Sequence, residues 1–500
     1  MYTKDWIAKW AVYSPAKVAL KELDTGRTLT YAELNHEANH LAAELTQRQG
    51  IRKGDRVMVI AEYSLEYVAL FVAAQKTGFI LVPVNYRLAV TEIDYLVGNC
   101  QPRLLLYEEQ FQEKALQLRR LSEIEEVWPL QRLNDLCHEA REQSSEPGFD
   151  AQEIAEDDPI FILYTSGTTG FPKGALYTHK MLLWNSLNTT MSLSLTPTDS
   201  TIVCTPPFHT GGWNVLLTPL LHRGGTVGFV KKFQPDRLLQ LLAQERTDLF
   251  MGVPTMLKMM MDSPEFATAD LSALRYIIVG GEALPLTVIQ AWHRRGIKIR
   301  QGFGLTEVGP NLFSLHQDDA EQKIGSIGRP NFYVDIKLID DEGQEVAPGE
   351  VGELCLRGPN VMPGYWNDPE ATAKAMLNGW FRTGDLLRED AEGYLYVMDR
   401  IKNMYISGGE NVYPAEIERF LLTFPGVSEA AVIGVPDEKW GEVGKAFIVT
   451  KGIEVSAEAV QSYCCANLAR FKVPKYVELV AELPKSDTGK INKKVLKASV

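Results

Sequence analysis

Short apolar runs alternate with amphipathic segments through the first half of the chain. The apolar runs are those expected of buried strands, and they cover residues 56–61, 80–84, 104–107, 160–164, 201–204, 248–251 and 276–279. Apolar positions recur with helical spacing between them, for example over 65–77 and over 30–45, where Thr30-x-x-Glu33 forms a capping box. This alternation predicts α/β layers built on parallel sheets.

The pattern changes toward antiparallel strands further along the chain. Residues 336–339 and 351–357 are hydrophobic stretches with the turn Asp341-Glu342-Gly343 between them, a combination typical of hairpins. The passage therefore predicts a β-rich subdomain.

A separate C-terminal unit is expected after a strand at 394–398 and the charged stretch 399–403. Its own alternation comprises helices at 414–422 and 457–468 and strands at 430–435 and 445–449. We therefore predict an α/β fold in three parts. These are a large N-terminal domain of layered α/β sheets plus the β-rich subdomain (1–399), a hinge (400–403), and a small mobile α+β C-terminal domain (404–500).

Composition is that of a globular enzyme. The 500 residues exceed what one core usually supports, and the formal charge of −13 argues against a nucleic-acid partner. The six cysteines show no C-x-x-C spacing, so neither zinc nor a disulfide framework is implied. Apolar runs of about 18 residues do not occur. We expect a cytoplasmic protein without integral membrane association.

One segment, expected to form a loop just after an apolar run, concentrates groups that bind anions. Residues 164–174, YTSGTTGFPKG, contain three glycines, four serine or threonine hydroxyls and one lysine. Accessible backbone N–H groups, hydroxyl donors and an ammonium all favour polyphosphate oxygens. A nucleoside triphosphate P-loop needs G-x-x-x-x-G-K-[ST]; this segment fails that spacing because Pro172 precedes Lys173 and Gly174 follows it.

Five further motifs accompany this segment. They are GGEAL at 280–284, GFGLTE at 302–307, TGD at 383–385, DRIK at 399–402 and PKSDTGK at 484–490. Together they closely resemble the signatures of the AMP-forming acyl-activating enzymes, which include acyl-CoA synthetases and nonribosomal peptide adenylation domains. The resemblance spans nearly the whole chain. It implies ATP, Mg2+ and CoA, and a carboxylic acid that is first joined to AMP and then passed to a thiol.

The resemblance also implies roles for single residues in adenylation. Lys490 would reach the carboxylate and α-phosphate, Thr306 the α-phosphate, and Glu307 the Mg2+. The implied nucleotide contacts are Gly281, Glu282, Ala283 and Phe303 (between Gly302 and Gly304) at adenine, Asp385 at ribose, Arg400 at ribose or phosphate, and Thr165, Ser166, Gly167, Thr168, Thr169 and Lys173 at pyrophosphate. Without such motifs, Lys490 would be interpreted as a solvated lysine and Glu307 as a surface glutamate. Asp385 would be interpreted as an aspartate that stabilises a turn, and Phe303 as a core aromatic.

A second step in another domain arrangement is implied as well. Lys402 occupies the family's hinge position, and the glycines of Ser407-Gly408-Gly409 would let the pantetheine arm pass close to backbone. Trp440 is implied to contact the CoA nucleotide, with interdomain packing as its alternative.

The segment 206–214, PPFHTGGWN, resembles the part of acyl-CoA synthetases beside the acyl group. We expect His209 to shape the acyl pocket between the two half-reactions. The alternative is a buried histidine that hydrogen-bonds to the backbone. The candidate channel residues are Val253, Thr255, Met256, Leu305 and Val308. An aspartate that would pair an amino group is not evident, which favours an apolar acid.

The expected partners are therefore this acid, ATP and CoA, with a homodimer left open. A medium- or long-chain fatty acid is the first candidate, and a benzoate- or cinnamate-like acid is the alternative. Loading of a carrier protein and a nucleotide-binding pseudoenzyme are the remaining alternatives.

Overall fold

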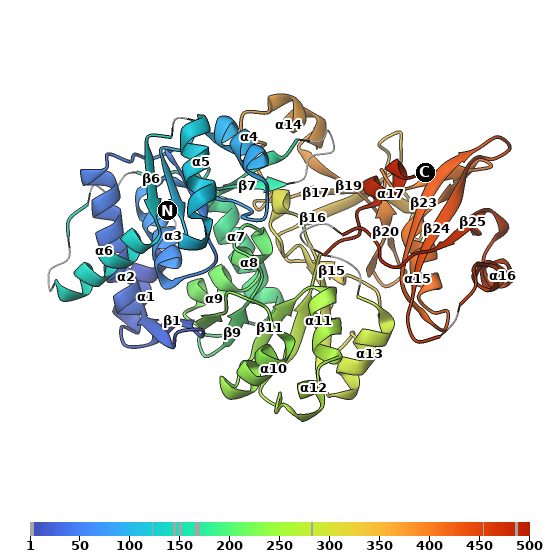
Figure 1. The fold of residues 1–500 in the computed structure, drawn as a ribbon, viewed down its shortest axis with the longest axis horizontal. Helices are drawn as coiled ribbons and strands as arrows, with labels where there is room; N and C mark the ends of the chain where they lie inside the picture. The colour runs from blue at the N-terminus through green and yellow to red at the C-terminus, as the bar shows by residue number, and fades with distance from the viewer. Residues whose placement is uncertain are drawn as a thin grey trace.

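Four β-sheets, of nine, six, five and five strands, organise the part of the chain that the structure describes. The computed structural model describes residues 5–122, 124–143, 147–149, 153–165, 171–281, 284–453, 455–485 and 489–500. The two larger sheets and their helices fill the left and centre of Figure 1, while the C-terminal strands lie at its right.

The six-stranded sheet has the order β6–β5–β3–β4–β7–β8 and is parallel except for the pair β7–β8. Its strands are β3 (Arg56–Ile60), β4 (Ile80–Pro83), β5 (Leu104–Tyr107), β6 (Glu126–Pro129), β7 (Pro159–Thr165) and β8 (Lys173–Thr178). The helices of this region are α2 (Tyr31–Ala43), α3 (Leu65–Thr77), α4 (Val90–Cys100), α5 (Gln112–Ser122) and α6 (Gln131–Glu142). Helix α2 begins with the predicted capping box of Thr30 and Glu33.

The nine-stranded sheet has the order β15–β14–β13–β12–β11–β9–β10–β1–β2. Its strands are β1 (Val18–Glu22), β2 (Arg27–Thr30), β9 (Ser200–Val203), β10 (Thr226–Phe229), β11 (Leu249–Gly252), β12 (Tyr276–Val279), β13 (Lys298–Phe303), β14 (Phe313–Ser314) and β15 (Arg329–Pro330). The central strands are parallel, and antiparallel strands close both edges. The helices are α1 (Trp6–Tyr13), α7 (His179–Ser192), α8 (Thr210–Asn214), α9 (Leu217–Arg223), α10 (Pro235–Gln244), α11 (Pro254–Met261), α12 (Glu265–Thr268) and α13 (Leu286–Arg294).

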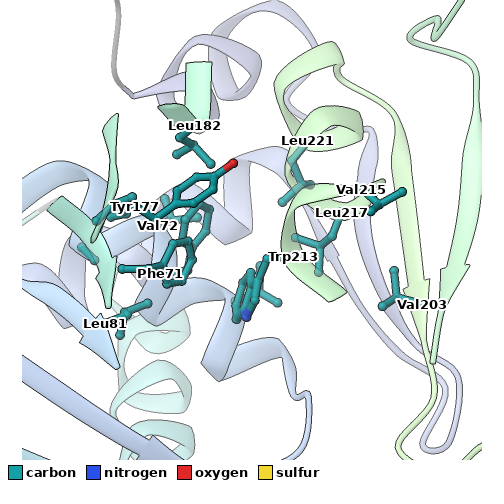
Figure 2. Close-up of a cluster of buried hydrophobic side chains, with 14 of the residues drawn as sticks. Phe71, Val72, Leu81, Tyr177, Leu182, Val203, Trp213, Val215, Leu217 and Leu221 are labelled. Atoms are coloured by element: carbon teal, nitrogen blue, oxygen red, sulfur yellow. The ribbon is translucent and has the colours of Figure 1, made fainter. Parts of the chain in front are cut away.

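An aromatic cluster joins these two sheets. Trp213 on α8 is fully buried, and its ring centroid lies 5.2 Å from that of Phe71 and 5.5 Å from that of Phe161. Figure 2 shows Trp213 between Phe71 on one side and Val215 and Leu217 on the other. Because truncating such a buried ring typically costs about 3–5 kcal/mol, the cluster contributes strongly to holding the sheets together.

The first five-stranded sheet is the predicted β-rich subdomain, and all its pairs are antiparallel. Its strands are β16 (Asp335–Ile339), β17 (Val351–Arg357), β18 (Met376–Leu377), β19 (Trp380–Glu389) and β20 (Leu395–Arg400), with α14 (Pro369–Ala375) beside them. The predicted turn follows β16, where Gly343 has φ +80° and donates its N–H to Asp340 O at 3.1 Å.

The C-terminal domain has its own sheet and its own core. Its elements are β21 (Tyr405–Ser407), β22 (Glu410–Val412), α15 (Pro414–Leu421), β23 (Val427–Asp437), β24 (Gly441–Thr450), α16 (Ala457–Asn467), β25 (Tyr476–Leu479) and α17 (Lys493–Ala498). Within the described ranges, each hydrophobic cluster lies wholly before residue 398 or wholly after residue 404. Separate cores are what two independently packed domains require.

The predicted helix–strand alternation is confirmed, and one expectation needs correction. The segment 164–174 is not a loop throughout, because Thr165 ends β7, Lys173 begins β8, and the two residues pair in register. Strands β1 and β2 were not predicted, since their charged and hydroxyl residues, as in Arg27-Thr28-Leu29-Thr30, obscure the apolar pattern. In the described part of the chain, no helix is both long and apolar enough to span a membrane.

Candidate active site

Glu307 lies where the two large sheets meet. It sits on a short 3-10 helix, Thr306–Val308, directly after β13 of the nine-stranded sheet. Its Oε1 accepts hydrogen bonds from Thr165 Oγ1 at 3.3 Å and from the Tyr365 hydroxyl at 3.0 Å. The structure therefore brings the expected magnesium carboxylate against the first residue of the expected pyrophosphate segment.

Lys173 joins the same group from the start of β8. Its Nζ lies 5.2 Å from the centroid of the Tyr365 ring, and Thr165 Oγ1 lies 3.5 Å from the Lys173 carbonyl oxygen. The predicted site residues that lie outside the described part of the chain are Ser166, Gly167, Thr168, Thr169, Glu282 and Ala283.

The GFGLTE motif positions Glu307 through tight backbone packing. A Cβ on Gly304 would lie 2.1 Å from the Pro310 carbonyl oxygen, so a larger residue would have to displace backbone. Phe303 on β13 is half-buried, and its ring meets that of Phe313 edge-on with centroids 5.8 Å apart. Gly302 pairs with Ser314 in the adjoining strand. One edge of Phe303 thus packs in the core while part of the ring stays exposed.

Asp385 and Arg400 face each other on β19 and β20. Arg400 Nε lies 2.8 Å from Asp385 Oδ1, whereas the buried Asp385 Oδ2 has no hydrogen-bond partner among the described residues. Burial raises the pKa of Asp385, and the charges of Arg400, Lys490 and Lys402 oppose that rise. A buried, unsatisfied acceptor costs about 1–3 kcal/mol, so Oδ2 is suited to accept a ligand hydroxyl.

Positive charge is in excess around this carboxylate. Arg400, Lys402 and Lys490 all act on Asp385, and Lys494 acts on Lys402. Loss of water around its ammonium, together with the charges of Arg400 and Lys494, lowers the pKa of Lys402. Several cations facing one carboxylate in an acidic chain suit a polyphosphate ligand.

Lys490 reaches this group from the C-terminal domain. A Cβ built on Gly281, two residues after β12, would lie 3.9 Å from Lys490 Cε. A Cβ on Gly489 would lie 3.5 Å from Thr255 Oγ1 on α11. The segment that carries Lys490 therefore lies against the nine-stranded sheet, at the start of the GGEAL motif that follows β12.

The expected hinge is tied to the C-terminal domain by Asp399. This buried carboxylate accepts hydrogen bonds from Arg400 N at 2.7 Å, Asn403 Nδ2 at 3.1 Å and Ala415 N at 2.7 Å. Ala415 lies in the first turn of α15, where a carboxylate is favourable. Asp399 had no predicted role of its own; its position directly before Arg400 was the available signal.

His209 immediately precedes α8 and is half-buried, with its ring centroid 4.5 Å from that of Phe208. A Cβ on Gly212 would lie 2.6 Å from both the Pro206 carbonyl oxygen and the Tyr63 hydroxyl, so the space behind α8 is filled. Of the expected channel residues, Val308 is fully buried in the core, while Val253 lies next to Gly281.

The residues expected to handle CoA gather elsewhere. Gly408 and Gly409, with φ of +61° and +89°, form the tight turn between Ser407 on β21 and Glu410 on β22. Gly408 N donates to Trp440 O at 2.9 Å, and the Trp440 ring is 48% exposed. The described contacts of this turn stay within the C-terminal domain. The structure thus brings together described residues that were expected to serve adenylation, whereas the contacts of the turn expected to bind CoA lie within the C-terminal domain.

Two family models match the chain. The AMP-binding enzyme model matches residues 7–366, and the AMP-binding enzyme C-terminal domain model matches residues 416–490. The chain belongs to the AMP-binding enzyme family.

Its curated relatives are CoA ligases for different acids. A feruloyl-CoA synthase from Amycolatopsis sp. is 38% identical over 98% of this chain and 97% of its own. The long-chain-fatty-acid–CoA ligase FadD13 from Mycobacterium tuberculosis is 38% identical over 97% and 96%. The indoleacetate–CoA ligase from Aromatoleum aromaticum is 38% identical over 99% and 97%. The chain is accordingly an AMP-forming acid–CoA ligase, and enzymes of this class use ATP, Mg2+ and CoA.

Two solved structures of one protein differ in their similarity to this chain. ATP-bound MatB from Rhodopseudomonas palustris is 30% identical, covers 100% of this chain and 99% of its own, and has a TM-score of 0.91. The apo form of MatB, 31% identical with the same coverage, has a TM-score of 0.83. The overall structure of this chain is therefore more similar to the ATP-bound form of MatB than to the apo form.

Proposed function

We propose that this ligase activates an apolar carboxylic acid at the junction of its two domains and then transfers the acyl group to CoA. The observation that carries the proposal is the convergence of Lys490 with Asp385 and Gly281. It places an ammonium from the small domain against groups of the large domain that suit a nucleotide.

In the first step, a carboxylate oxygen of the substrate attacks the α-phosphorus of ATP, and the bond to pyrophosphate breaks. Lys490 offsets the negative charge that accumulates between the two reactants, and Thr306 donates to the α-phosphate. Glu307 would hold Mg2+, which neutralises charge on the phosphate oxygens. Lys173 and Thr165 would hold the pyrophosphate.

The nucleoside contacts follow from the same geometry. Asp385 Oδ2, buried and unpartnered within the described residues, accepts a ribose hydroxyl, and Arg400 contacts ribose or phosphate. Gly281 and the exposed part of Phe303, between Gly302 and Gly304, flank adenine. These contacts fix the α-phosphorus relative to Lys490, which is how positioning lowers the barrier.

In the second step, the CoA thiol attacks the acyl carbon and AMP leaves. We assign residues 1–399 and 404–500 to the two domains and residues 400–403, with Lys402, to the pivot between them. Rotation about the pivot would withdraw Lys490 and bring the Ser407–Gly409 turn and Trp440 to the acyl-adenylate. His209 would shape the acyl site between the two steps.

The acid is proposed to be apolar because apolar side chains lie beside Gly211 of the expected acyl segment and beside Gly281. A Cβ on Gly211 would lie 3.5 Å from Met251 Cε, and one on Gly281 would lie 4.0 Å from Val253 Cγ1. A fatty acid of medium or long chain is the first candidate. A cinnamate-like acid is the second, favoured by the filled space behind α8 at Gly212.

The test is AMP formation with ATP and Mg2+ over fatty, aromatic and amino acids, each with and without CoA. CoA-dependent AMP formation with one apolar class supports the proposal and selects between the candidates. Turnover with amino acids alone, or pyrophosphate release with no effect of CoA, would contradict it.

A further inference from the structure

Tyr365 lies outside all the sequence motifs, in the connection between β17 and α14. Its backbone is fixed on β8, because Tyr365 forms a β-bridge with Ala175 and the N–H of Trp366 donates to Gly174 O at 2.7 Å. The Tyr365 N–H also donates to Thr372 Oγ1 at 2.9 Å, on α14. These backbone contacts therefore hold the Tyr365 side chain at the end of β8 that carries Lys173.

The two parts of this side chain contact two different residues of the site. The hydroxyl donates to Glu307 Oε1 at 3.0 Å, and the ring lies 5.2 Å from Lys173 Nζ. A cation over the face of an aromatic ring is attracted by the negative potential of the ring. One residue thus links the carboxylate proposed for the metal with the lysine proposed for pyrophosphate.

The hydroxyl has a definite effect on the Glu307 carboxylate. In the described part of the chain, both hydrogen bonds to this carboxylate, from Tyr365 and from Thr165, end on Oε1. Two donors on one oxygen fix the plane of the carboxylate and leave Oε2 for a cation, as groups that orient metal ligands do. The Tyr365 side chain is a phenol, so its O–H group can donate to an ionised carboxylate, which can only accept.

We propose that Tyr365 is a positioning residue for adenylation. Its hydroxyl orients Glu307 so that Oε2 faces the magnesium nucleotide, and its ring supports Lys173 beside the departing pyrophosphate. This inference rests on the proposed function, in which Glu307 holds Mg2+, and it requires no contact between Tyr365 and substrate.

Tyr365→Phe separates the hydroxyl from the ring. In ATP–pyrophosphate exchange, the Mg2+ concentration for half-maximal activity should rise about 10-fold, the lower end of what lost ligand-orienting contacts cost. Saturating Mg2+ should restore most of the rate, with the KM for the acid unchanged. Thioester formation from preformed acyl-adenylate should not change. Tyr365→Leu, which also removes the ring, should add a loss that Mg2+ does not restore.

The matched control is Tyr276→Phe, which deletes a buried hydroxyl that donates to Leu193 O, away from the site. It should leave the Mg2+ requirement unchanged, and melting temperatures should be compared for all variants. A wild-type Mg2+ curve for Tyr365→Phe, or equal shifts in both phenylalanine variants, would overturn the positioning role.

Glu307→Gln distinguishes failure of this inference from failure of the proposed function. If Glu307→Gln leaves the Mg2+ requirement unchanged, the proposed metal role of Glu307 is wrong. If it raises the requirement, adding Tyr365→Phe should produce no further rise. A full additional rise in the double variant would show that Tyr365 acts independently of Glu307.

Discussion

The site has two corners that are built in different ways. The Glu307 corner, formed by Glu307, Thr165, Lys173 and Tyr365, is held by contacts within the N-terminal domain. The Lys490 corner, formed by Lys490, Asp385, Arg400 and Lys402, depends on a lysine contributed by the C-terminal domain. The described contacts of the first corner involve only the N-terminal domain, whereas the second corner includes a residue of the C-terminal domain. Under the proposed function, the metal site is therefore preorganised, and the charge that stabilises the transition state comes from a domain that moves between the two steps.

Removing the moving charge should have the largest effect. Lys490→Ala should lower acyl-adenylate formation by about 10³-fold, the cost of losing a major electrostatic contact. Thioester synthesis from preformed acyl-adenylate should be nearly unchanged, because the proposed rotation withdraws Lys490 before the second step. Single-turnover assays of each half-reaction measure this. Lys497→Ala, which removes an exposed charge on α17, is the control, and equal losses in both half-reactions would refute the separation.

Restricting the pivot should affect the other half-reaction. Lys402→Pro removes backbone freedom at the proposed hinge, and misplacing the CoA residues should cost the thioester step about 10²-fold. The rate of adenylation should fall less, since the structure already has the closed arrangement that adenylation is proposed to use. Lys402→Ala separates the lost charge from the lost freedom. If the proline variant transfers to CoA as fast as the alanine variant, residue 402 is not the pivot.

Asp385 tests the nucleotide side of the Lys490 corner. Asp385→Asn should raise the KM for ATP about 10-fold, since a hydrogen bond to a charged group contributes about 1.5–3 kcal/mol. Burial raises the pKa of Asp385, so protonation should begin above the pH at which an ordinary aspartate protonates. In the wild type, kcat/KM for ATP should fall as the pH drops through that range, and the asparagine variant should lack this fall. If the asparagine variant shows the same fall in kcat/KM at low pH, the fall is caused by another titrating group.

The smallest effect is expected at the CoA turn. Gly408→Ala places a Cβ 2.8 Å from Trp440 Cε3 at φ +61°, and the backbone strain alone costs about 1–2 kcal/mol. Thioester formation should fall and adenylation should not. Gly409→Ala carries similar strain but meets nothing within 4 Å, so the difference between the two variants measures the Trp440 contact. Equal kinetics in the two would remove Trp440 from the CoA site.

The sequence predicted the fold well where the apolar pattern was strong. Buried runs such as 104–107 and 276–279 coincide with strands β5 and β12, since nearly continuous apolar residues leave few alternatives. The hairpin β1–β2 was missed because its alternating polar residues resemble a loop. Strand β8 was missed because its first residues, Lys173 and Gly174, are also typical of a phosphate loop.

Prediction of the site depended on whether a residue's role can be inferred from a short motif. Glu307, Asp385 and Lys490 could be proposed because each lies in a motif whose chemistry is local. Tyr365 could not, because its partner Glu307 is 58 residues away and no short pattern records that contact. Asp399 likewise acts on Ala415 through a contact that only the folded hinge creates.

The central claim is that the closed arrangement serves adenylation and must open for transfer to CoA. Thr255→Cys with Gly489→Cys tests it directly, because a Cβ on Gly489 would lie 3.5 Å from Thr255 Oγ1, close enough for a disulfide across the domains. The exposed Cys465 should be replaced by serine first, and the reduced variant is the control for the substitutions themselves. The oxidised enzyme should catalyse ATP–pyrophosphate exchange but form no acyl-CoA until reductant is added. Acyl-CoA formation at the same rate in the oxidised and reduced forms would contradict the account.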